Sequence, residues 1–448
     1  MDSKKDCKKP IHFEEDPGVH FIATYETEGG PKERHYVDAN VHREELRRKV
    51  MASARAPERI ATTKARRATR AGKNPVSGLR VGYAFWGFLG DIKMNGQGDR
   101  VSSPDGNATY SWSIVWEMMK RGHRVIPMMP DRDQPACGEY GVHNFSAFCQ
   151  KQRTDAYKHL LESKYNYGEE GFPELDVLLL EWRFPIPGRN CQMGHLGESD
   201  PNYQPDLTRQ SALLQHYRNT KTKIIVWDLD YKLTEENEKE WDLPLIIETS
   251  MAPRALYSPR RSVEPPTVVD ALMEHKTTVA STIMAYIGSR YERDDVIDEW
   301  IRPIANRDMC RGRIHFYGNW MKDIKELRER WPGVSFHDRV TTSDFHSIYR
   351  PAGAVPLLAK REYMERGFVT PRIWEALQFG SIPVGLEGHT GISRYTSFVA
   401  KDTCDLGAIA ICLRDLTLKE RDQIRQDAIE KIAFMDVRHF VDVIEESV

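Results

Sequence analysis

The stretch Thr370-Pro-Arg-Ile-Trp-Glu-Ala-Leu-Gln-Phe-Gly-Ser-Ile-Pro-Val384 decides the fold, because it indicates a helix that runs directly into a buried strand. Thr370 can cap this helix, and Pro371 suits its first turn. The same alternation precedes it, with expected strands at 282–288, 313–318, 334–337 and 354–359 and expected helices at 295–303 and 342–350. We therefore expect a doubly wound α/β domain over residues 266–415.

A similar domain is expected upstream, over residues 76–265. It opens with a strand, a glycine-containing loop, a helix and a strand, at 79–86, 87–91, 105–121 and 124–129. Further apolar runs, at 175–182, 223–228 and 244–248, are typical of parallel strands that helices cover on both faces. A proline-rich join at 263–267 separates the two Rossmann-like domains. Such domains would face a cleft, where ligands bind beyond the carboxyl ends of the strands.

Both ends of the chain differ from these domains. Residues 1–75 are polar, with a β-hairpin expected at 19–38 around a Gly-Gly turn. The segment 43–73 then carries an excess of about eight positive charges, which favours either a solvated arm or contact with a polyanion such as DNA. Residues 416–448 have apolar residues at helical spacing and are expected to form a C-terminal helical segment.

Composition excludes several classes of protein. The 448 residues include 10 Trp, 18 Tyr and 16 Phe, which excludes a chain that is disordered as a whole. The 7 cysteines are scattered and never form a C-x-x-C pair, so neither a disulfide framework nor a structural zinc site is expected. No apolar run is long enough to span a membrane, and the basic start lacks the apolar stretch of a secretory signal. We expect a cytoplasmic protein.

Arg372 and Glu375 are the candidate binding residues in the helix that begins near Thr370. Arg372 falls in the first turn, where a guanidinium fork could add paired hydrogen bonds to a diphosphate. Glu375 follows about one turn later on the same face, where its carboxylate could accept hydrogen bonds from ribose or sugar hydroxyls. The alternative is an ordinary amphipathic helix with an exposed Arg–Glu pair.

This segment resembles the donor-binding helix of GT-B glycosyltransferases, in their group 1 and spore-maturation-type branches. Similar stretches are Pro104–Tyr110, Met119–Val125, Trp331–His337 and Tyr349–Ala352, so the resemblance covers roughly residues 78–445. It implies a nucleotide-diphosphate-sugar donor as co-substrate, no bound cofactor and no metal. It also implies donor-binding roles for Gly106, Asn107, Gly288, Arg290, Arg293, Thr370, Arg372 and Glu375. Glu365 lies ten positions before Glu375, farther than the usual acidic pair, so only Glu375 is carried over.

The acid–base residue and the acceptor are less constrained. Asp91, at the end of the glycine loop, could take the proton of an acceptor hydroxyl, although an Asp there also suits a turn cap. Asp228 and Asp230 are its rivals. The acceptor could be a modified DNA base, reached through the segment 43–73, or a glycan, lipid or small molecule. The alternative function is a non-catalytic nucleic-acid-binding protein; a dinucleotide oxidoreductase ranks low because no G-x-G-x-x-G follows a strand.

Overall fold

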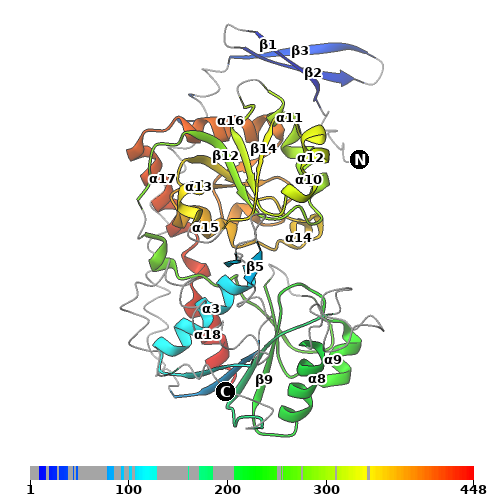
Figure 1. The fold of residues 1–448 in the computed structure, drawn as a ribbon, viewed down its shortest axis with the longest axis vertical. Helices are drawn as coiled ribbons and strands as arrows, with labels where there is room; N and C mark the ends of the chain where they lie inside the picture. Colours follow the sequence, from blue (N-terminus) through cyan, green and yellow to red (C-terminus); the bar gives the residue numbers. More distant parts are fainter. Residues whose placement is uncertain are drawn as a thin grey trace, which may run out of the picture.

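A computed structural model of the protein describes most of the chain from residue 206 onward and separate segments before it. The described residues are 10–16, 20–27, 30–38, 44, 47–48, 78–84, 92–94, 100–102, 106–128, 160, 171–184, 206–249, 254, 256–273, 276–307, 310–340 and 344–448. Two α/β domains are stacked along the long axis of the molecule, and a small antiparallel sheet lies beyond one of them (Figure 1). The expectation of two doubly wound domains is confirmed.

The N-terminal domain is built on a six-stranded parallel sheet. Its strand order is β11(Arg260–Ser262), β10(Ile246–Glu248), β9(Lys223–Asp228), β8(Val177–Glu181), β4(Arg80–Ala84) and β7(Arg124–Pro127). Along β8 the buried side chains alternate: Leu179 packs in the same cluster as α3(Gly106–Lys120), whereas Leu178 and Leu180 pack with α8(Asp206–Tyr217). Helices therefore cover both faces, which explains the continuous apolar runs of these strands.

The C-terminal domain repeats this plan with a second six-stranded parallel sheet. Its order is β14(Val334–His337), β13(Ile314–Tyr317), β12(Thr282–Ile287), β15(Ala352–Pro356), β16(Ile382–Leu386) and β17(Val399–Ala400). The helices between these strands are α10(Asp294–Trp300), α11(Arg302–Ala305), α12(Ile324–Arg330), α13(Phe345–Tyr349), α14(Arg361–Arg366) and α15(Arg372–Gln378). A short strand pair, β5(Ile92–Met94) and β6(Arg100–Ser102), lies on the side of the N-terminal domain that faces this one (Figure 1).

The C-terminal helices connect the two domains. The segment expected as one helical unit contains two main helices, α17(Leu418–Lys431) and α18(Val437–Glu445), which follow α16(Thr403–Arg414). Helix α18 returns to the N-terminal domain, where Phe440 packs against Trp227 with ring centroids 4.9 Å apart. Arg121 forms ion pairs with Asp442 and Glu445, both at 2.8 Å. Because α18 packs on α3, the first domain is completed by the last helix of the chain.

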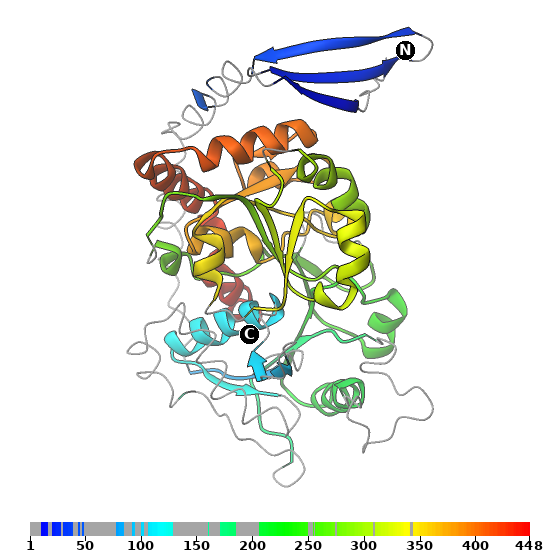
Figure 2. The same cartoon turned by 45° about the horizontal axis from the view of Figure 1, so that its top comes forward.

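The N-terminal extension forms a three-stranded antiparallel sheet of β1(Pro10–Asp16), β2(His20–Thr27) and β3(Gly30–Asp38). The pairing of β2 with β3 is the hairpin expected from the sequence, and β1 is an additional strand. This sheet lies beyond the C-terminal domain, at the end far from the N-terminal domain, in both views (Figures 1 and 2). Of the basic segment, Arg47 pairs with Glu420 of α17 at 2.6 Å, and nearly all of its other residues lie outside the described ones.

Helix α15 is held at its carboxyl end by two buried arginines of α17. Arg421 donates hydrogen bonds to the carbonyls of Ala352, Gly353, Leu413 and Gly380, and Arg425 donates to those of Leu272, Leu377 and Gln378. Burial lowers the pKa of Arg421 to about 10. Since carbonyls at a helix C-terminus are negatively polarised, these cations stabilise that end of α15.

Truncation of Phe440 tests how α18 completes the N-terminal domain. Phe440→Ala should lower the free energy of unfolding by about 3–5 kcal/mol, because it leaves a cavity against Trp227 in a buried core. The measurement is urea-induced unfolding. Leu418→Ala, at an exposed position on α17, should change it by less than about 0.5 kcal/mol. Equal effects of the two changes would contradict the packing described for α18.

Candidate functional site

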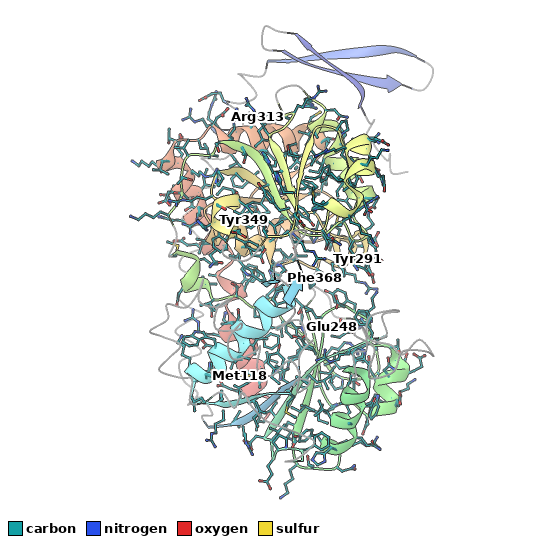
Figure 3. The ribbon with its side chains drawn as sticks, in the orientation of Figure 1. Met118, Glu248, Tyr291, Arg313, Tyr349 and Phe368 are labelled. Carbon is teal, nitrogen blue, oxygen red and sulfur yellow. The ribbon has the colours of Figure 1, made fainter. Side chains whose placement is uncertain are left out.

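The carboxyl ends of strands from both sheets meet at the junction of the two domains. Glu248, at the end of β10, lies on the side of the N-terminal domain that faces Phe368 of the C-terminal domain (Figure 3). Direct contacts cross the junction: the Tyr363 hydroxyl donates to Asp230 at 2.6 Å, and the Tyr110 hydroxyl donates to the Val369 carbonyl at 3.4 Å. The candidate residues therefore gather at the edge where doubly wound sheets bind ligands.

Arg372 begins α15 and points back over the end of β12. Its Nε donates to the Ile287 carbonyl at 2.6 Å, and its guanidinium lies 4.6 Å from the centre of the Tyr286 ring. Gly288 makes this path possible, because a Cβ at this position would lie 2.3 Å from Nη2 of Arg372. Thr370 does not cap the helix as expected: Pro371 takes the N-cap position, and the Thr370 hydroxyl accepts from Nη1 of Arg372 at 3.0 Å.

Arg293 is a buried cation close to the partly buried Arg372. Only 7% of it is exposed, and its Nη1 donates to the carbonyls of Ser289 at 3.2 Å and Tyr291 at 2.8 Å. Among the residues that the structure describes, neither its Nε nor the buried Tyr286 hydroxyl has a hydrogen-bond partner. Burial lowers the pKa of Arg293, and the nearby positive charge of Arg372 lowers it further.

Within the described part of the chain, no ion pair neutralises the charge of these two guanidiniums. Among the described residues, no carboxylate lies within salt-bridge distance of either arginine. Arg372 and the Tyr286 hydroxyl thus lie at Gly288, and Arg293 lies on the loop that follows it. Such a set of donors fits an anion with several oxygens, such as a diphosphate.

Arg290, on the same loop, is engaged elsewhere. Its guanidinium pairs with Asp294 at 2.6 Å and with Glu326 at 2.7 Å, and these bonds raise its pKa. Its charge is thus already balanced at the start of α10. Of the two loop arginines expected to act together, Arg293 joins Arg372 and Arg290 does not.

Glu375 lies one turn after Arg372 and is partly exposed. Burial raises its pKa to about 7, against the opposing attraction of Arg372. Among the described residues, no hydrogen-bond donor reaches its carboxylate within bonding distance. The side chain therefore remains able to accept hydrogen bonds from a bound hydroxyl.

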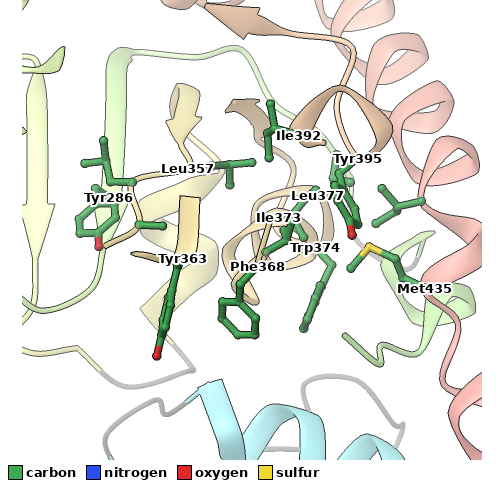
Figure 4. Close-up of a cluster of buried hydrophobic side chains, with 14 of the residues drawn as sticks. Tyr286, Leu357, Tyr363, Phe368, Ile373, Trp374, Leu377, Ile392, Tyr395 and Met435 are labelled. Carbon is green, nitrogen blue, oxygen red and sulfur yellow. The ribbon is translucent and has the colours of Figure 1, made fainter. Parts of the chain in front are cut away.

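The start of α3 abuts this site from the N-terminal domain. Gly106 and Asn107 are the first two residues of α3. One turn later the buried ring of Tyr110 packs edge-on against Trp374 of α15 at 5.4 Å and against Trp227 of β9 at 5.9 Å. Trp374 and Phe368 project from the C-terminal domain toward α3 (Figure 4). Sequence reasoning missed Tyr110; an aromatic residue in the second turn of α3 was the available signal.

The three acid–base candidates differ in their surroundings, and one of them lies outside the described residues. Asp91 lies outside the described residues. Asp228 is buried, accepts from the backbone N–H groups of Lys232 at 2.9 Å and Leu233 at 3.0 Å, and pairs with Arg254. Burial raises the pKa of Asp228 to about 6, while Arg254 acts against this rise. Asp230 is partly exposed and reaches Tyr363 of the other domain.

The described residues include neither a metal-binding cluster nor a membrane-spanning helix. They contain no group of three or more His, Cys, Asp or Glu side chains placed to hold a metal ion. In that part of the chain, no helix combines the length and apolar character that crossing a bilayer requires.

The fold is similar to that of known glycosyltransferases. A structure described as the DNA-modifying enzyme beta-glucosyltransferase, with and without its substrate uridine diphosphoglucose, has a TM-score of 0.50 at 12% identity and covers 82% of this chain and 99% of its own. The structure of T4 phage BGT in complex with UDP and Mn2+ has a TM-score of 0.48 at 13% identity, and the match covers 82% of this chain and 99% of that one. A glycosyltransferase from Rickettsia africae has a TM-score of 0.48 at 10% identity, and the match covers 83% of this chain and 99% of that one.

The first of these structures establishes the likeness of fold: the chain has two Rossmann-like domains in the GT-B arrangement, as the sequence resemblance implied. No protein-family model matches the chain, and no curated protein matches its sequence. At this identity the likeness concerns the fold alone.

The raised pKa of Glu375 predicts a pH dependence of stability. Between its usual pKa of 4.5 and about 7, the folded state keeps a proton that the unfolded chain releases. The free energy of unfolding should therefore fall as the pH rises through this window, by about 1–3 kcal/mol from this group. Glu375→Gln should remove that part of the slope, measured by urea unfolding between pH 5 and 8.

Glu365→Gln is the matched control, because Glu365 is exposed on the neighbouring helix α14. It should keep the slope of the unmodified protein. If Glu375→Gln and the unmodified protein had the same slope, the pKa of Glu375 would not be raised in the folded state.

Proposed function

We propose that the protein transfers a sugar from a nucleotide-diphosphate-sugar donor to an acceptor hydroxyl. The observation that carries this proposal is the position of Arg372 at Gly288 and of Arg293 on the loop that follows it, without a carboxylate partner among the described residues, at the junction of two doubly wound domains. A glycosyl donor needs cations for its diphosphate and an acceptor group for its hydroxyls. Glu375 supplies the acceptor group one helical turn from Arg372.

Each residue has a distinct role in this proposal. Arg293 and Arg372 hold the diphosphate, and their charge stabilises the negative charge that grows on it as the sugar leaves. Gly288 lets the chain approach the phosphates closely. Glu375 accepts hydrogen bonds from ribose or sugar hydroxyls. The start of α3, with Gly106 and Asn107, closes the site from the other domain and helps to exclude water, which would otherwise compete as acceptor.

A carboxylate would take the proton of the acceptor hydroxyl as it attacks the sugar. Asp91 and Asp230 remain the candidates for this role, because Asp228 is already engaged by Arg254 and two backbone N–H groups. Of the two described rivals, Asp230 is favoured, since it lies at the domain junction and keeps partial exposure.

A hydroxymethylated DNA base is one proposed acceptor. The basic segment 43–73 supports it, and so does the similar fold of an enzyme described as DNA-modifying. Glycans, lipids and small molecules are the other candidates, with a hexose or pentose as the transferred sugar. The second candidate function, a non-catalytic nucleic-acid-binding protein, would use the basic segment but would not need Arg372 or Glu375.

Thermal unfolding with UDP-glucose and with ADP-, GDP- and dTDP-sugars tests the donor site. A donor present at 100 times its dissociation constant should add about 2.7 kcal/mol of stability. Arg372→Gln and Arg293→Gln should each weaken that donor at least about tenfold, because each removes charge-assisted bonds to phosphate. Arg361→Gln is the control, since Arg361 pairs with Asp295 and Glu299 on the outer side of α10.

The control variant should bind the donor as the unmodified protein does. If no nucleotide sugar stabilised the protein, or if Arg372→Gln were stabilised equally, the proposed donor site would be wrong.

Transfer to DNA is tested with a duplex that contains 5-hydroxymethylcytosine and an otherwise identical unmodified duplex. If DNA is the acceptor, radiolabelled sugar should enter only the first duplex. The rate at low DNA concentration should fall steeply between 50 and 200 mM salt, on the order of 10-fold or more, because bound phosphates release counterions. Equal transfer to a free hydroxymethylated nucleoside would contradict DNA as the acceptor, but it would still support the proposed sugar transfer.

A further inference from the structure

Asp230 is held by a side chain of the opposite domain. It lies two residues beyond the end of β9, and its Oδ1 accepts a hydrogen bond of 2.6 Å from the Tyr363 hydroxyl. Tyr363 belongs to α14 in the C-terminal domain, and its ring projects from that domain with the hydroxyl at its far end (Figure 4). A second pair, Lys232 with Glu362 at 3.5 Å, joins the same two elements.

The turn that carries Asp230 is fixed on the other side by Arg254. This side chain pairs with Asp228 and Glu248 and donates to the carbonyls of Tyr231 at 3.3 Å and Leu233 at 3.1 Å. Tyr231 has a φ of +57°, which a residue with a side chain adopts only where its surroundings impose it. The backbone around Asp230 is therefore held in one conformation.

Tyr363 also lies close to the phosphate site. Burial raises the pKa of Tyr363, as does the negative charge of Asp230, and the positive charge of Arg293 acts against this rise. The phenol therefore stays a neutral donor at ordinary pH. Lys360, just before α14, pairs with Glu292 at 3.0 Å and covers the Tyr291 ring at 4.1 Å. Helix α14 thus connects the loop that carries Arg293 with the turn that carries Asp230.

We propose that Tyr363 is the positioning residue for Asp230 in sugar transfer, an inference that rests on the proposed function. Asp230 takes the proton of the acceptor hydroxyl while the acceptor oxygen bonds to the anomeric carbon. The bond from that carbon to the diphosphate oxygen breaks, and its electron pair stays on the diphosphate between Arg293 and Arg372. Tyr363 donates to Oδ1 of this carboxylate and thereby sets its orientation toward the acceptor.

This arrangement has a consequence for the order of events. The base belongs to the N-terminal domain, whereas the group that aims it belongs to the domain that holds the donor. Asp230 is therefore correctly aimed only when the two domains are apposed. Proton removal is thereby tied to the state in which the donor phosphates and the acceptor lie together, which limits loss of the sugar to water.

The test compares Tyr363→Phe, Asp230→Asn and the double variant, with Tyr395→Phe as the matched control. Tyr395 is also buried and also donates to a carboxylate, that of Glu264, at 2.6 Å. The probe is UDP-glucose, with release of UDP measured in the presence of water alone, hydroxymethylated duplex DNA and a panel of sugars. Affinity for UDP is measured separately by calorimetry.

Tyr363→Phe should lower kcat about 10- to 100-fold, because the carboxylate loses its orientation, and should leave KM for the donor and the affinity for UDP within twofold. Asp230→Asn should lower kcat at least about 100-fold. The double variant should be no slower than Asp230→Asn, because Tyr363 acts only through Asp230. Tyr395→Phe should keep kcat within twofold.

Three results would overturn the proposal alone: a Tyr363→Phe variant as fast as the unmodified protein, effects that multiply in the double variant, or a raised KM with unchanged kcat. The last would place Tyr363 in the phosphate site. If the unmodified protein bound UDP but released none from UDP-glucose under any condition, the proposed transfer of glucose would fail and the role of Tyr363 in it would fail too.

Discussion

Two arginine side chains are held in place by backbone carbonyls, and the candidate site depends on this. Arg372 donates to the Ile287 carbonyl, and Arg293 donates to those of Ser289 and Tyr291. A carbonyl orients a guanidinium without neutralising it, whereas a carboxylate would do both. The positive charge therefore remains available at Gly288, in surroundings where burial strengthens its attraction for an anion.

The same use of carbonyls fixes the helix that delivers Arg372. Arg421 and Arg425 bind carbonyls at the carboxyl end of α15 and on β15, while Trp374 near its start packs against Tyr110 of the other domain. Both ends of this seven-residue helix are thus anchored. An anchored helix limits the positions open to the Arg372 guanidinium, and such restraint favours binding of a diphosphate in one geometry.

Neighbouring acids acquire different properties from their surroundings. Asp228 and Asp230 are separated by one residue, yet Asp228 is buried against Arg254 and two backbone N–H groups, whereas Asp230 extends to the other domain. Asp228 therefore stabilises the turn, and the turn positions Asp230 at the domain junction. Glu375 and Glu365 also differ in their surroundings, since Glu365 is exposed on α14, whereas burial raises the pKa of Glu375 to about 7.

Local sequence determined the two doubly wound domains, because apolar strands, glycine loops and amphipathic helices are encoded within a few residues of one another. It also determined that Arg372 and Glu375 share one helical face. Only the tertiary structure decided which of the two loop arginines forms ion pairs. Asp294 and Glu326 pair with Arg290, and nothing in the spacing of Gly288-Ser-Arg-Tyr-Glu-Arg293 distinguishes Arg290 from Arg293. The contacts of Tyr110 with Trp374 and of Tyr363 with Asp230 also join residues more than 130 positions apart. Such contacts depend on how the domains pack, which no local pattern records.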